Sequence, residues 1–223
     1  FNNISKSFGK LKILDQLNLA FFKGQSIALI GPNGSGKTTL IKCLLGLVVP
    51  TSGEIKIDGV NAIGSWMHRS NIGYMPQIGR YPDNITVMQL FEMIKEIRKG
   101  TFVKLDEELL HSFEIFKFEN KTMSSLSGGM RQKVSACLAF MFDPEILILD
   151  EPTAGLDPLA AEILKEKIIA EKNNGKLILI TSHLLSELDD LITQLIFMQD
   201  GKIEFHHTIN ELKKNTGEEK ISK

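Results

Sequence analysis

Residues 31–38 read Gly31-Pro32-Asn33-Gly34-Ser35-Gly36-Lys37-Thr38. They match the pattern G-x-x-x-x-G-K-[ST], a glycine-rich loop that wraps the phosphates of a nucleotide. The apolar run Ser26–Ile30 before the loop predicts a strand, and Lys37–Leu45 after it predicts a helix. The motif requires this strand–loop–helix order, because backbone N–H groups at a helix N-terminus attract phosphate. The core of the fold is therefore expected around a nucleotide site.

Two side chains of this loop carry specific chemistry. Lys37 is expected to reach the β- and γ-phosphates as a point charge, and the Thr38 hydroxyl to bind Mg²⁺. A turn that merely joined a strand to a helix would need neither of them. The residues expected to contact nucleotide here are Gly31, Pro32, Asn33, Gly34, Ser35, Gly36, Lys37, Thr38 and Thr39.

A pair of carboxylates ends another apolar run. Asp150 and Glu151 follow Ile146–Leu149, and ligands of open α/β sheets bind beyond the carboxyl ends of the strands. Asp150 is the candidate to hold Mg²⁺, directly or through water, and Glu151 the candidate general base for an attacking water. The alternative is a solvated strand end without function.

The strand pattern predicts an α/β fold. Ile146–Leu149 and Leu177–Ile180 are apolar on both faces, which is typical of parallel strands covered by helices. Between them, apolar residues recur at helical spacing after Asp157, a predicted N-cap, and Pro158, at the first helical position. These apolar residues are Leu159, Ile163, Ile168 and Ile169.

Other short strands are expected to form antiparallel sheet. Asn18–Phe22 has strand composition, and Glu54–Ile57 alternates polar and apolar residues before the turn pair Asp58-Gly59. Near the other end, Ile196-Phe197-Met198 precedes the turn pair Asp200-Gly201 and a returning strand at Lys202–Phe205. The tail at residues 213–223 is charged and is expected to be frayed.

The middle of the chain has only helical periodicity. Residues 83–142 contain apolar side chains at helical spacing and no strand pattern. We therefore expect one domain of 223 residues, in which 1–82 and 143–223 form the α/β core with an antiparallel β subdomain and 83–142 form an inserted helical subdomain. The periodic apolar residues are Val87, Leu90, Phe91, Ile94, Ile97, Leu105, Leu109, Leu110 and Phe113.

Composition narrows the class of protein. The formal net charge of −1 gives no general reason to expect nucleic-acid binding. No apolar run approaches the roughly 18 residues of a membrane span, and no segment resembles a signal peptide. Cys43 and Cys137 lie within apolar helical patterns and are expected to be buried reduced thiols. If the protein acts at a membrane, another chain must supply the spanning part.

Seven segments together resemble the nucleotide-binding subunit of an ATP-binding-cassette (ABC) transporter, over nearly the whole chain and in the family's order. In this resemblance 31–38 is the Walker A loop, Ile146–Glu151 the Walker B strand and Leu126-Ser127-Gly128-Gly129-Met130 the family signature. The remaining matches are Phe8 for the aromatic residue on adenine, Gln77 for the glutamine that senses Mg²⁺ and the attacking water, Ala154-Gly155-Leu156-Asp157 for the D-loop and His183 for the switch histidine.

The resemblance implies ATP and Mg²⁺ as cofactors, with Thr38, Gln77 and Asp150 as the metal-binding residues. It also implies that His183 contacts the γ-phosphate. Two positions depart from the family pattern: Phe8 stands where tyrosine is usual and lacks its hydroxyl, and Met130 replaces the usual glutamine of the signature. The implied catalytic residues are Glu151, His183, Lys37 and Gln77.

Most of these residues have simpler interpretations when taken alone. Phe8 could be core packing, and Gln77 an exposed loop residue. His183 could start a helix or fill the core, while Asp157 is already explained as a helix cap and could serve both purposes. Ser127 with the glycines after it could be an N-cap with a flexible lead-in. The order and spacing of the whole set favour the family interpretation.

The resemblance also implies an assembly. Two ATPase subunits would pack head to tail as a homodimer, so that Ser127, Gly128, Gly129 and Asp157 of one copy act in trans on ATP held by the other. A separate integral membrane permease subunit would receive the resulting motion at a groove that includes 77–84. The chain would then lie on the cytoplasmic, inner face of the cell membrane, and its compact form resembles the ATPases of small bacterial exporters.

Two other functions use the same site. A soluble ABC ATPase could drive assembly or remodelling of a partner complex, such as loading of an iron–sulfur scaffold, without transport. A DNA-maintenance ATPase of the same superfamily would need long coiled-coil insertions, and the stretch between Gln77 and Ser127 is too short for them. The motifs do not separate transport from assembly; co-purification with a membrane protein would.

Overall fold

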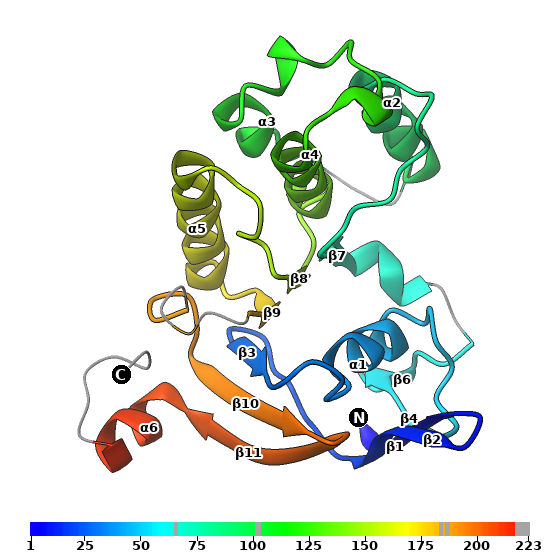
Figure 1. Cartoon of the computed structure of the whole chain (residues 1–223), viewed down its shortest axis with the longest axis vertical. Helices are drawn as coiled ribbons and strands as arrows, with labels where there is room; N and C mark the ends of the chain where they lie inside the picture. Colours follow the sequence, from blue (N-terminus) through cyan, green and yellow to red (C-terminus); the bar gives the residue numbers. More distant parts are fainter. Residues whose placement is uncertain (65–66, 101–103, 183–184, 186–187, 217–223) are drawn as a thin grey trace.

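The computed structural model places the elements as a sheet-centred core with a helical part beside it (Figure 1). It describes residues 1–64, 67–100, 104–182, 185 and 188–216. Among the described residues, none of the helices combines the length and apolar character that a membrane crossing demands.

A six-stranded sheet forms the centre of the core. Its strand order is β11-β10-β3-β9-β8-β7, and all neighbours pair in parallel except β10 and β11, which form an antiparallel hairpin at one edge. The predicted parallel sheet is thereby confirmed, as is the turn at Asp200-Gly201. The strands are β3 (Ser26–Ile30), β7 (Ile72–Met75), β8 (Ile146–Asp150), β9 (Leu177–Thr181), β10 (Gln194–Gln199) and β11 (Lys202–Thr208).

Alternate residues of the central strands face two separate hydrophobic clusters. In β8, Leu147 and Leu149 belong to one cluster and Ile148 to the other. The same alternation divides Ile178 from Leu179 in β9. Because successive side chains of a strand point to opposite faces, both faces of this sheet are covered. That double burial explains why these strands are apolar at every position.

Helices on the two faces supply the rest of these clusters. The helix α1 (Lys37–Leu44) packs on one face, and α5 (Pro158–Asn173) on the other, together with α4 (Gly128–Phe140). The predicted start of α5 is confirmed, since the Asp157 carboxylate caps the helix and Pro158 is its first residue. Such caps contribute about 1 kcal/mol of helix stability.

The first strands form the expected antiparallel part, but in different places. A three-stranded sheet has the order β2-β1-β4, with β1 (Asn2–Phe8), β2 (Leu11–Leu17) and β4 (Ser52–Glu54). A small hairpin follows, in which β5 (Lys56–Ile57) turns through Asp58-Gly59 into β6 (Val60–Asn61) as predicted.

The predicted strand at Asn18–Phe22 is wrong. Its backbone groups pair with groups outside any sheet: the Leu19 N–H donates to the Phe1 carbonyl at 3.1 Å, and the Phe22 N–H donates to the Gln25 side chain at 2.8 Å. Phe22 and Gln25 also close a turn, with Gln25 N–H donating to the Phe22 carbonyl at 3.2 Å. The segment connects β2 to β3, because a strand needs a neighbouring strand and not only a suitable composition.

Residues 83–142 are helical wherever the structure describes regular elements, apart from an isolated bridge between Thr86 and Thr122. The helix α2 (Val87–Ile97) begins at a capping box in which the Thr86 and Gln89 side chains bond each other's backbone N–H. The shorter α3 (Glu108–Ser112) follows, and two 3₁₀ turns, Ile115–Lys117 and Met123–Ser125, lie between α3 and α4. A further 3₁₀ turn, Met67–Asn71, lies outside this part of the chain and precedes β7.

The end of the chain is more ordered than expected. The helix α6 (Ile209–Thr216) includes residues 213–216 of the segment predicted to be frayed, and residues after 216 lie outside the described part. A side-chain cap explains the helix start: the Glu211 N–H donates to the Thr208 hydroxyl, and the Glu211 carboxylate accepts from Thr208 N–H. Both cysteines are buried and free, as predicted.

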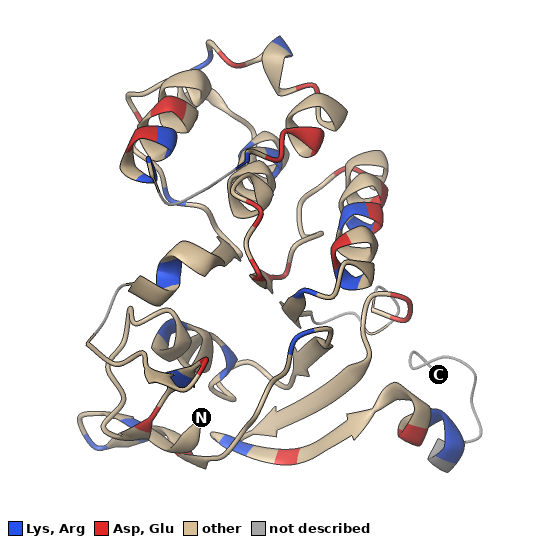
Figure 2. Ribbon diagram, turned by 180° about the vertical axis from the view of Figure 1, so that it is seen from behind, with Lys and Arg blue, Asp and Glu red and all other residues tan. Residues whose placement is uncertain are grey.

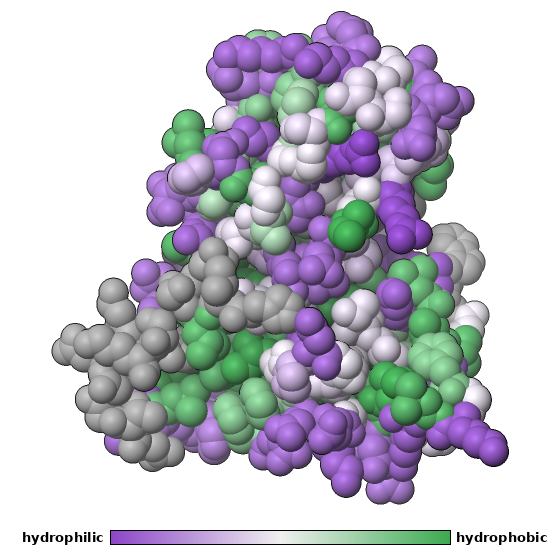
Figure 3. Space-filling view, viewed as in Figure 1, coloured by the Kyte–Doolittle hydropathy of each residue, from purple (hydrophilic) through white to green (hydrophobic). Residues whose placement is uncertain are grey.

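The surface carries charges of both signs. Lys and Arg alternate with Asp and Glu over the helices, most clearly along α5 (Figure 2). Hydrophobic residues gather in the lower half of the face in Figure 3, while hydrophilic residues dominate its upper part around α2 and α3.

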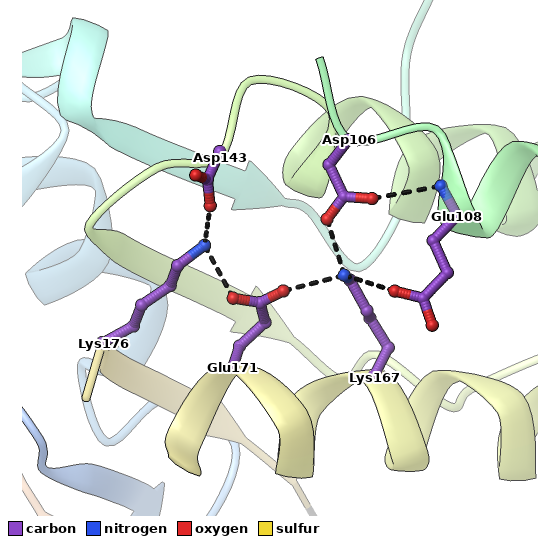
Figure 4. A network of polar contacts seen from close by, with 6 residues as sticks. All are labelled: Asp106, Glu108, Asp143, Lys167, Glu171 and Lys176. Carbon is purple, nitrogen blue, oxygen red and sulfur yellow. Dashed lines mark hydrogen bonds and ion pairs between the residues drawn. The ribbon is translucent and has the colours of Figure 1, made fainter. Parts of the chain in front are cut away.

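A buried ionic network joins α5 to the helical part of the chain (Figure 4). The Lys167 side chain is 6% exposed, and its ammonium group bonds Asp106, Glu108 and Glu171 at 2.5–2.8 Å. Lys176 joins Glu171 to Asp143, which follows α4. Burial disfavours the charge on Lys167, but the three carboxylates outweigh it and raise its pKa above the ordinary value. The ammonium group is therefore charged at every physiological pH.

Replacing Lys167 with methionine is expected to lower the free energy of unfolding by roughly 3 kcal/mol, because it removes one of the two lysines that pair with the buried Glu171 carboxylate and leaves Asp106 without this partner. Chemical denaturation measures the effect. The matched control is Lys165→Met on the same helix, for which less than about 1 kcal/mol is expected. Equal losses in the two variants would contradict a stabilising role of the network.

Candidate functional site

A cavity of about 230 Å³ lies where β3, β7 and β8 end at the same edge of the sheet. It brings together the glycine-rich loop, the carboxylate pair and the glutamine, which are far apart in the sequence. Its lining residues are Ile13, Asn33, Gly34, Ser35, Gly36, Lys37, Thr38, Thr39, Gln77, Asp150 and Glu151.

The loop at 31–36 requires glycine at its ends. Gly31 has a φ of 148°, and a Cβ there would lie 2.1 Å from the Met198 carbonyl oxygen on β10. Gly36 has a φ of 105°, and its Cβ would lie 2.9 Å from the Ile13 carbonyl oxygen on β2. The loop is thus held against two strands. Ser35 is only 2% exposed, and its hydroxyl has no hydrogen-bond partner among the described residues, so it can donate to a polar ligand in the cavity.

The Lys37 ammonium group folds back over the loop. It donates to the Gly31 carbonyl at 2.7 Å and to the Pro32 carbonyl at 3.1 Å. Burial lowers the pKa of Lys37, while the charges of Glu151 and Asp150 oppose that shift. A partly buried cation therefore stands at the mouth of a loop of N–H donors. This arrangement binds anions such as phosphate.

Asp150 and Glu151 are both bonded to Thr181, the residue opposite Asp150 on the neighbouring strand β9. The Thr181 hydroxyl donates to Asp150 Oδ1. It also accepts from the Glu151 N–H at 3.1 Å, and the Thr181 carbonyl accepts from the same N–H. Asp150 continues the strand, whereas Glu151 leaves it with a φ of 52°. The two side chains consequently diverge from adjacent positions in the chain.

A positive φ at a glutamate is uncommon. For residues with a Cβ the left-handed region costs about 1–2 kcal/mol, and such strain gathers at functional sites because the surrounding structure must hold it. Here Thr181 holds the backbone, and Gln77 holds the side chain, because Gln77 Nε2 donates to Glu151 Oε2 at 2.9 Å. Gln77 lies just beyond the end of β7 and lines the same cavity.

Several predicted site residues do not line this cavity. Phe8 ends β1, is 52% exposed and lies with the Lys6 ammonium group 4.9 Å from its ring centroid. The signature residues are at the start of α4, where Ser127 is the N-cap and its hydroxyl accepts from the Met130 N–H at 3.2 Å. Ser127 and Gly128 are exposed to solvent. His183 lies outside the described residues.

Asp157 also lies away from the cavity. Its Oδ1 atom caps α5 through the Ala160 N–H at 2.9 Å, and its Oδ2 atom pairs with Lys133 on α4 at 2.8 Å. The predicted cap is confirmed, and the Lys133 contact is new. Hydrogen bonding to Lys133 lowers the pKa of the Asp157 carboxyl group, so this carboxylate is charged.

Sequence reasoning missed two residues of the site. Ile13 reaches the cavity from β2, a strand that the sequence pattern did not predict. Thr181 is not among the predicted site residues, although it bonds the Asp150 carboxylate and the Glu151 N–H. The signal for Thr181 was a polar residue at the end of a fully apolar strand, which is the same signal that identified Asp150.

The sequence model described as "ABC transporter" matches residues 14–154. The chain belongs to the ABC transporter family. It is an ATP-binding protein of this family and an ATPase, and its fold is that of the family's P-loop α/β cassette.

Curated relatives of this ABC protein are similar over most of its length. It is 37% identical to the uncharacterized ABC transporter ATP-binding protein YhaQ of Bacillus subtilis, over 99% of this chain and 74% of the relative. It is 33% identical to the Nod factor export ATP-binding protein I of Burkholderia lata, over 91% and 68%. It is 35% identical to the lantibiotic transport ATP-binding protein SrtF of Streptococcus pyogenes, over 90% and 86%.

Solved structures agree with the fold of this ABC protein. An ATP-binding subunit of an ABC transporter superposes with a TM-score of 0.88 at 28% identity, covering 97% of this chain and 92% of the other. A dimeric ATP-binding cassette in a post-hydrolysis state bound to ADP and Pi superposes with a TM-score of 0.82 at 24% identity, covering 93% and 97%. The second likeness concerns the fold alone.

Proposed function

We propose that this chain is the ATP-hydrolysing subunit of an exporter, that it pairs head to tail with a second ATPase subunit, and that this pair drives a separate membrane permease from the inner, cytoplasmic face. One observation carries the pairing: the cavity holds the phosphate loop and carboxylates, while the signature turn at Ser127 and Gly128 is exposed elsewhere on the same chain. The free N–H groups of the signature turn can bind an anion, and in the proposed pair this anion is the phosphate of ATP held by the other copy.

ATP fits the chemistry of the cavity. The N–H groups of 33–39, the Lys37 ammonium and the buried Ser35 hydroxyl are all donors, and phosphate oxygens are acceptors. Nucleotide binding would exchange the carbonyl partners of Lys37 for phosphate oxygens. The ammonium, freed from Gly31 and Pro32, would then lie against the β- and γ-phosphates.

Mg²⁺ also fits the residues present. Thr38, Gln77 and Asp150 contribute a hydroxyl, an amide and a carboxylate to one cavity, and Mg²⁺ prefers oxygen ligands with one or two protein carboxylates beside the phosphates. These three residues would hold the ion, which neutralises charge on the phosphates when bound. Thr181 would orient Asp150 for this role, and because Gln77 donates to Glu151 through its side-chain nitrogen, the Gln77 amide oxygen would serve as the ligand.

Glu151 is the proposed general base. Its carboxylate would accept the proton of the attacking water, and Gln77 and Thr181 would keep it at the correct edge of the cavity. His183 would contact the γ-phosphate. The second copy would supply Ser127, Gly128, Gly129 and Asp157.

The adenine contact is proposed at the hairpin of β1 and β2. Phe8 is half-exposed and its ring face is available to a base, while Ile13 from the paired strand already lines the cavity. Lys6 lies over the Phe8 ring, so stacking of adenine would use the opposite ring face. The absent tyrosine hydroxyl would cost no contact of this kind.

The membrane subunit is proposed to contact residues 77–84, beside the helical subdomain at 83–142. Tyr81 links that segment to the signature helix, because its hydroxyl donates to Ser135 on α4 at 3.0 Å and both groups are largely buried. A push on this segment would therefore reach α4. The export direction rests on relatives whose names specify Nod factor export and lantibiotic transport; nothing in the comparisons favours the alternative of an assembly ATPase.

Co-purification tests the transport assignment. The chain, tagged in the organism that encodes it, is expected to retain a polytopic membrane protein after detergent extraction, and the reconstituted pair to hydrolyse ATP faster than the chain alone. The control is the charge pair Arg80→Glu and Asp83→Lys in the proposed contact segment, which should release the membrane protein and leave basal ATPase activity intact. Recovery of a stable complex containing only water-soluble partners would reject the transporter assignment.

A further inference from the structure

We infer that Lys133 is a positioning residue, which locks the Asp157 turn to the signature helix so that the two elements meet the partner copy as one rigid edge. This inference rests on the proposed head-to-tail pairing. Lys133 lies on α4, six positions after the Ser127 cap, and Asp157 begins α5. Neither contact that Lys133 makes belongs to the phosphate cavity of its own chain.

The ion pair between Lys133 and Asp157 joins α4 directly to the start of α5. Lys133 Nζ lies 2.8 Å from Asp157 Oδ2, while Asp157 Oδ1 accepts the Ala160 N–H. Both carboxylate oxygens are thus used, one on α5 and one on α4. The Lys133 side chain is only 22% exposed, and its ammonium group lies 5.9 Å from the ring centroid of Phe113, which is within range of a cation–π contact. The lysine stem is therefore held between α3 and the Asp157 turn.

A second contact fixes the same two elements. A Cβ on Gly129 of the signature would lie 2.9 Å from the Gly155 carbonyl oxygen, so the helix start and the turn approach each other closely. Leu156 and Met130, one residue from each side of that contact, both pack on the same hydrophobic cluster. Backbone approach, apolar packing and an ion pair consequently hold the signature and the Asp157 turn together.

Ion pairs near the end of α5 form a second connection to the helical subdomain. Lys167 bonds Asp106 and Glu108 at the start of α3, and Lys176 pairs with Asp143 after α4 (Figure 4). Rotation of the helical part would therefore carry the start of α5 with it. Lys133 is the member of this set nearest to the residues proposed to act in trans. Replacing Lys133 should change how the Asp157 turn lies against the signature helix without unfolding the chain.

The test is ATP-driven dimerisation in a Glu151→Gln background, measured by light scattering of the full chain over a titration with Mg-ATP. Lys133→Gln is expected to raise the ATP concentration for half-maximal pairing on the order of tenfold, a typical size for coupling between sites. Lys133→Arg should restore pairing, because it keeps the cation. Lys121→Gln, an exposed lysine elsewhere in the helical part, removes the same charge and should behave as the parent.

Four further measurements separate a positioning role from a general loss of structure: ATP binding by the monomer, the unfolding midpoint, kcat and a double-variant cycle. Binding of ATP to the monomer and the unfolding midpoint should be unchanged in Lys133→Gln. In the otherwise native chain, this variant should lower kcat and leave the monomer affinity for ATP intact. Asp157→Asn keeps the cap oxygen and loses the pair, so the double variant with Lys133→Gln should be no worse than the more severe single one.

The outcomes distinguish the two proposals. If the Glu151→Gln parent pairs with ATP and Lys133→Gln pairs equally well, the role of Lys133 is rejected and the dimer stands. Additive effects of the Lys133 and Asp157 changes would also reject it. If the Glu151→Gln parent never pairs at saturating Mg-ATP, the head-to-tail dimer is rejected, and the inference falls with it.

Discussion

Replacing Glu151 with glutamine is expected to slow ATP hydrolysis by about 10²–10⁴-fold, the usual contribution of a general base. The amide has nearly the shape of the carboxylate but cannot take a proton from water. The phosphate loop, Lys37 and Asp150 are untouched, so ATP binding should persist and the paired state should accumulate. Phosphate release measures the first effect, and light scattering with Mg-ATP measures the second.

The control is Glu162→Gln, an exposed glutamate on α5, which should hydrolyse ATP at the parental rate. Both contacts of Glu151 should persist in this variant. The Gln77 amide can donate to the oxygen of the new side-chain amide, and Thr181 bonds only the backbone N–H at position 151. Undiminished turnover in Glu151→Gln would therefore remove Glu151 from the role of base.

Replacing Lys37 with alanine is expected to weaken ATP binding by roughly ten- to a hundredfold, since a hydrogen bond to a charged group contributes about 1.5–3 kcal/mol. Lys37 is the cation that lines the cavity, and it lies between the loop carbonyls and the carboxylates. Without it, the negative charges of Asp150 and Glu151 would face the incoming phosphates uncompensated. A calorimetric or fluorescent-nucleotide titration measures the change.

Lys42→Ala provides the matched control, because Lys42 lies on the same helix α1 and is exposed. It should bind ATP like the parent. Lys37→Ala should also keep its fold, since the ammonium's partners are loop carbonyls and not core groups. An unchanged nucleotide titration in a folded Lys37→Ala chain would mean that phosphate binding depends on the loop N–H groups alone.

Local patterns were sufficient for the elements that carry the chemistry. The strand β3, the loop at 31–38 and α1 appear where the motif predicted them, because backbone geometry, glycine and helix start are all encoded within a dozen residues. The start of α5 was equally local, since Asp157 and Pro158 act on the first turn of their own helix. Such local signals can be interpreted without knowing which other elements pack against the segment.

The sequence-based strand predictions were wrong or missing where the structure depends on which strands pair with each other. The Asn18–Phe22 segment has strand composition and is a connection, whereas β1 and β2 have mixed polarity and form a hairpin. Ile13 entered the cavity through that hairpin and could not be predicted without it. Thr181 became important only through its register with Asp150 on the adjacent strand.

The sequence by itself determined the phosphate loop, the carboxylate pair, the caps and the apolar pattern of the doubly buried strands, because each of these is written in residues close together in the chain. Only the tertiary structure decided which of these meet. It placed Gln77 against the Glu151 carboxylate, Thr181 against the Asp150 carboxylate and the Glu151 N–H, and Lys133 against Asp157. Those contacts join residues separated by 24 or more positions, and packing of β7, β8, β9 and the helices over them sets every one.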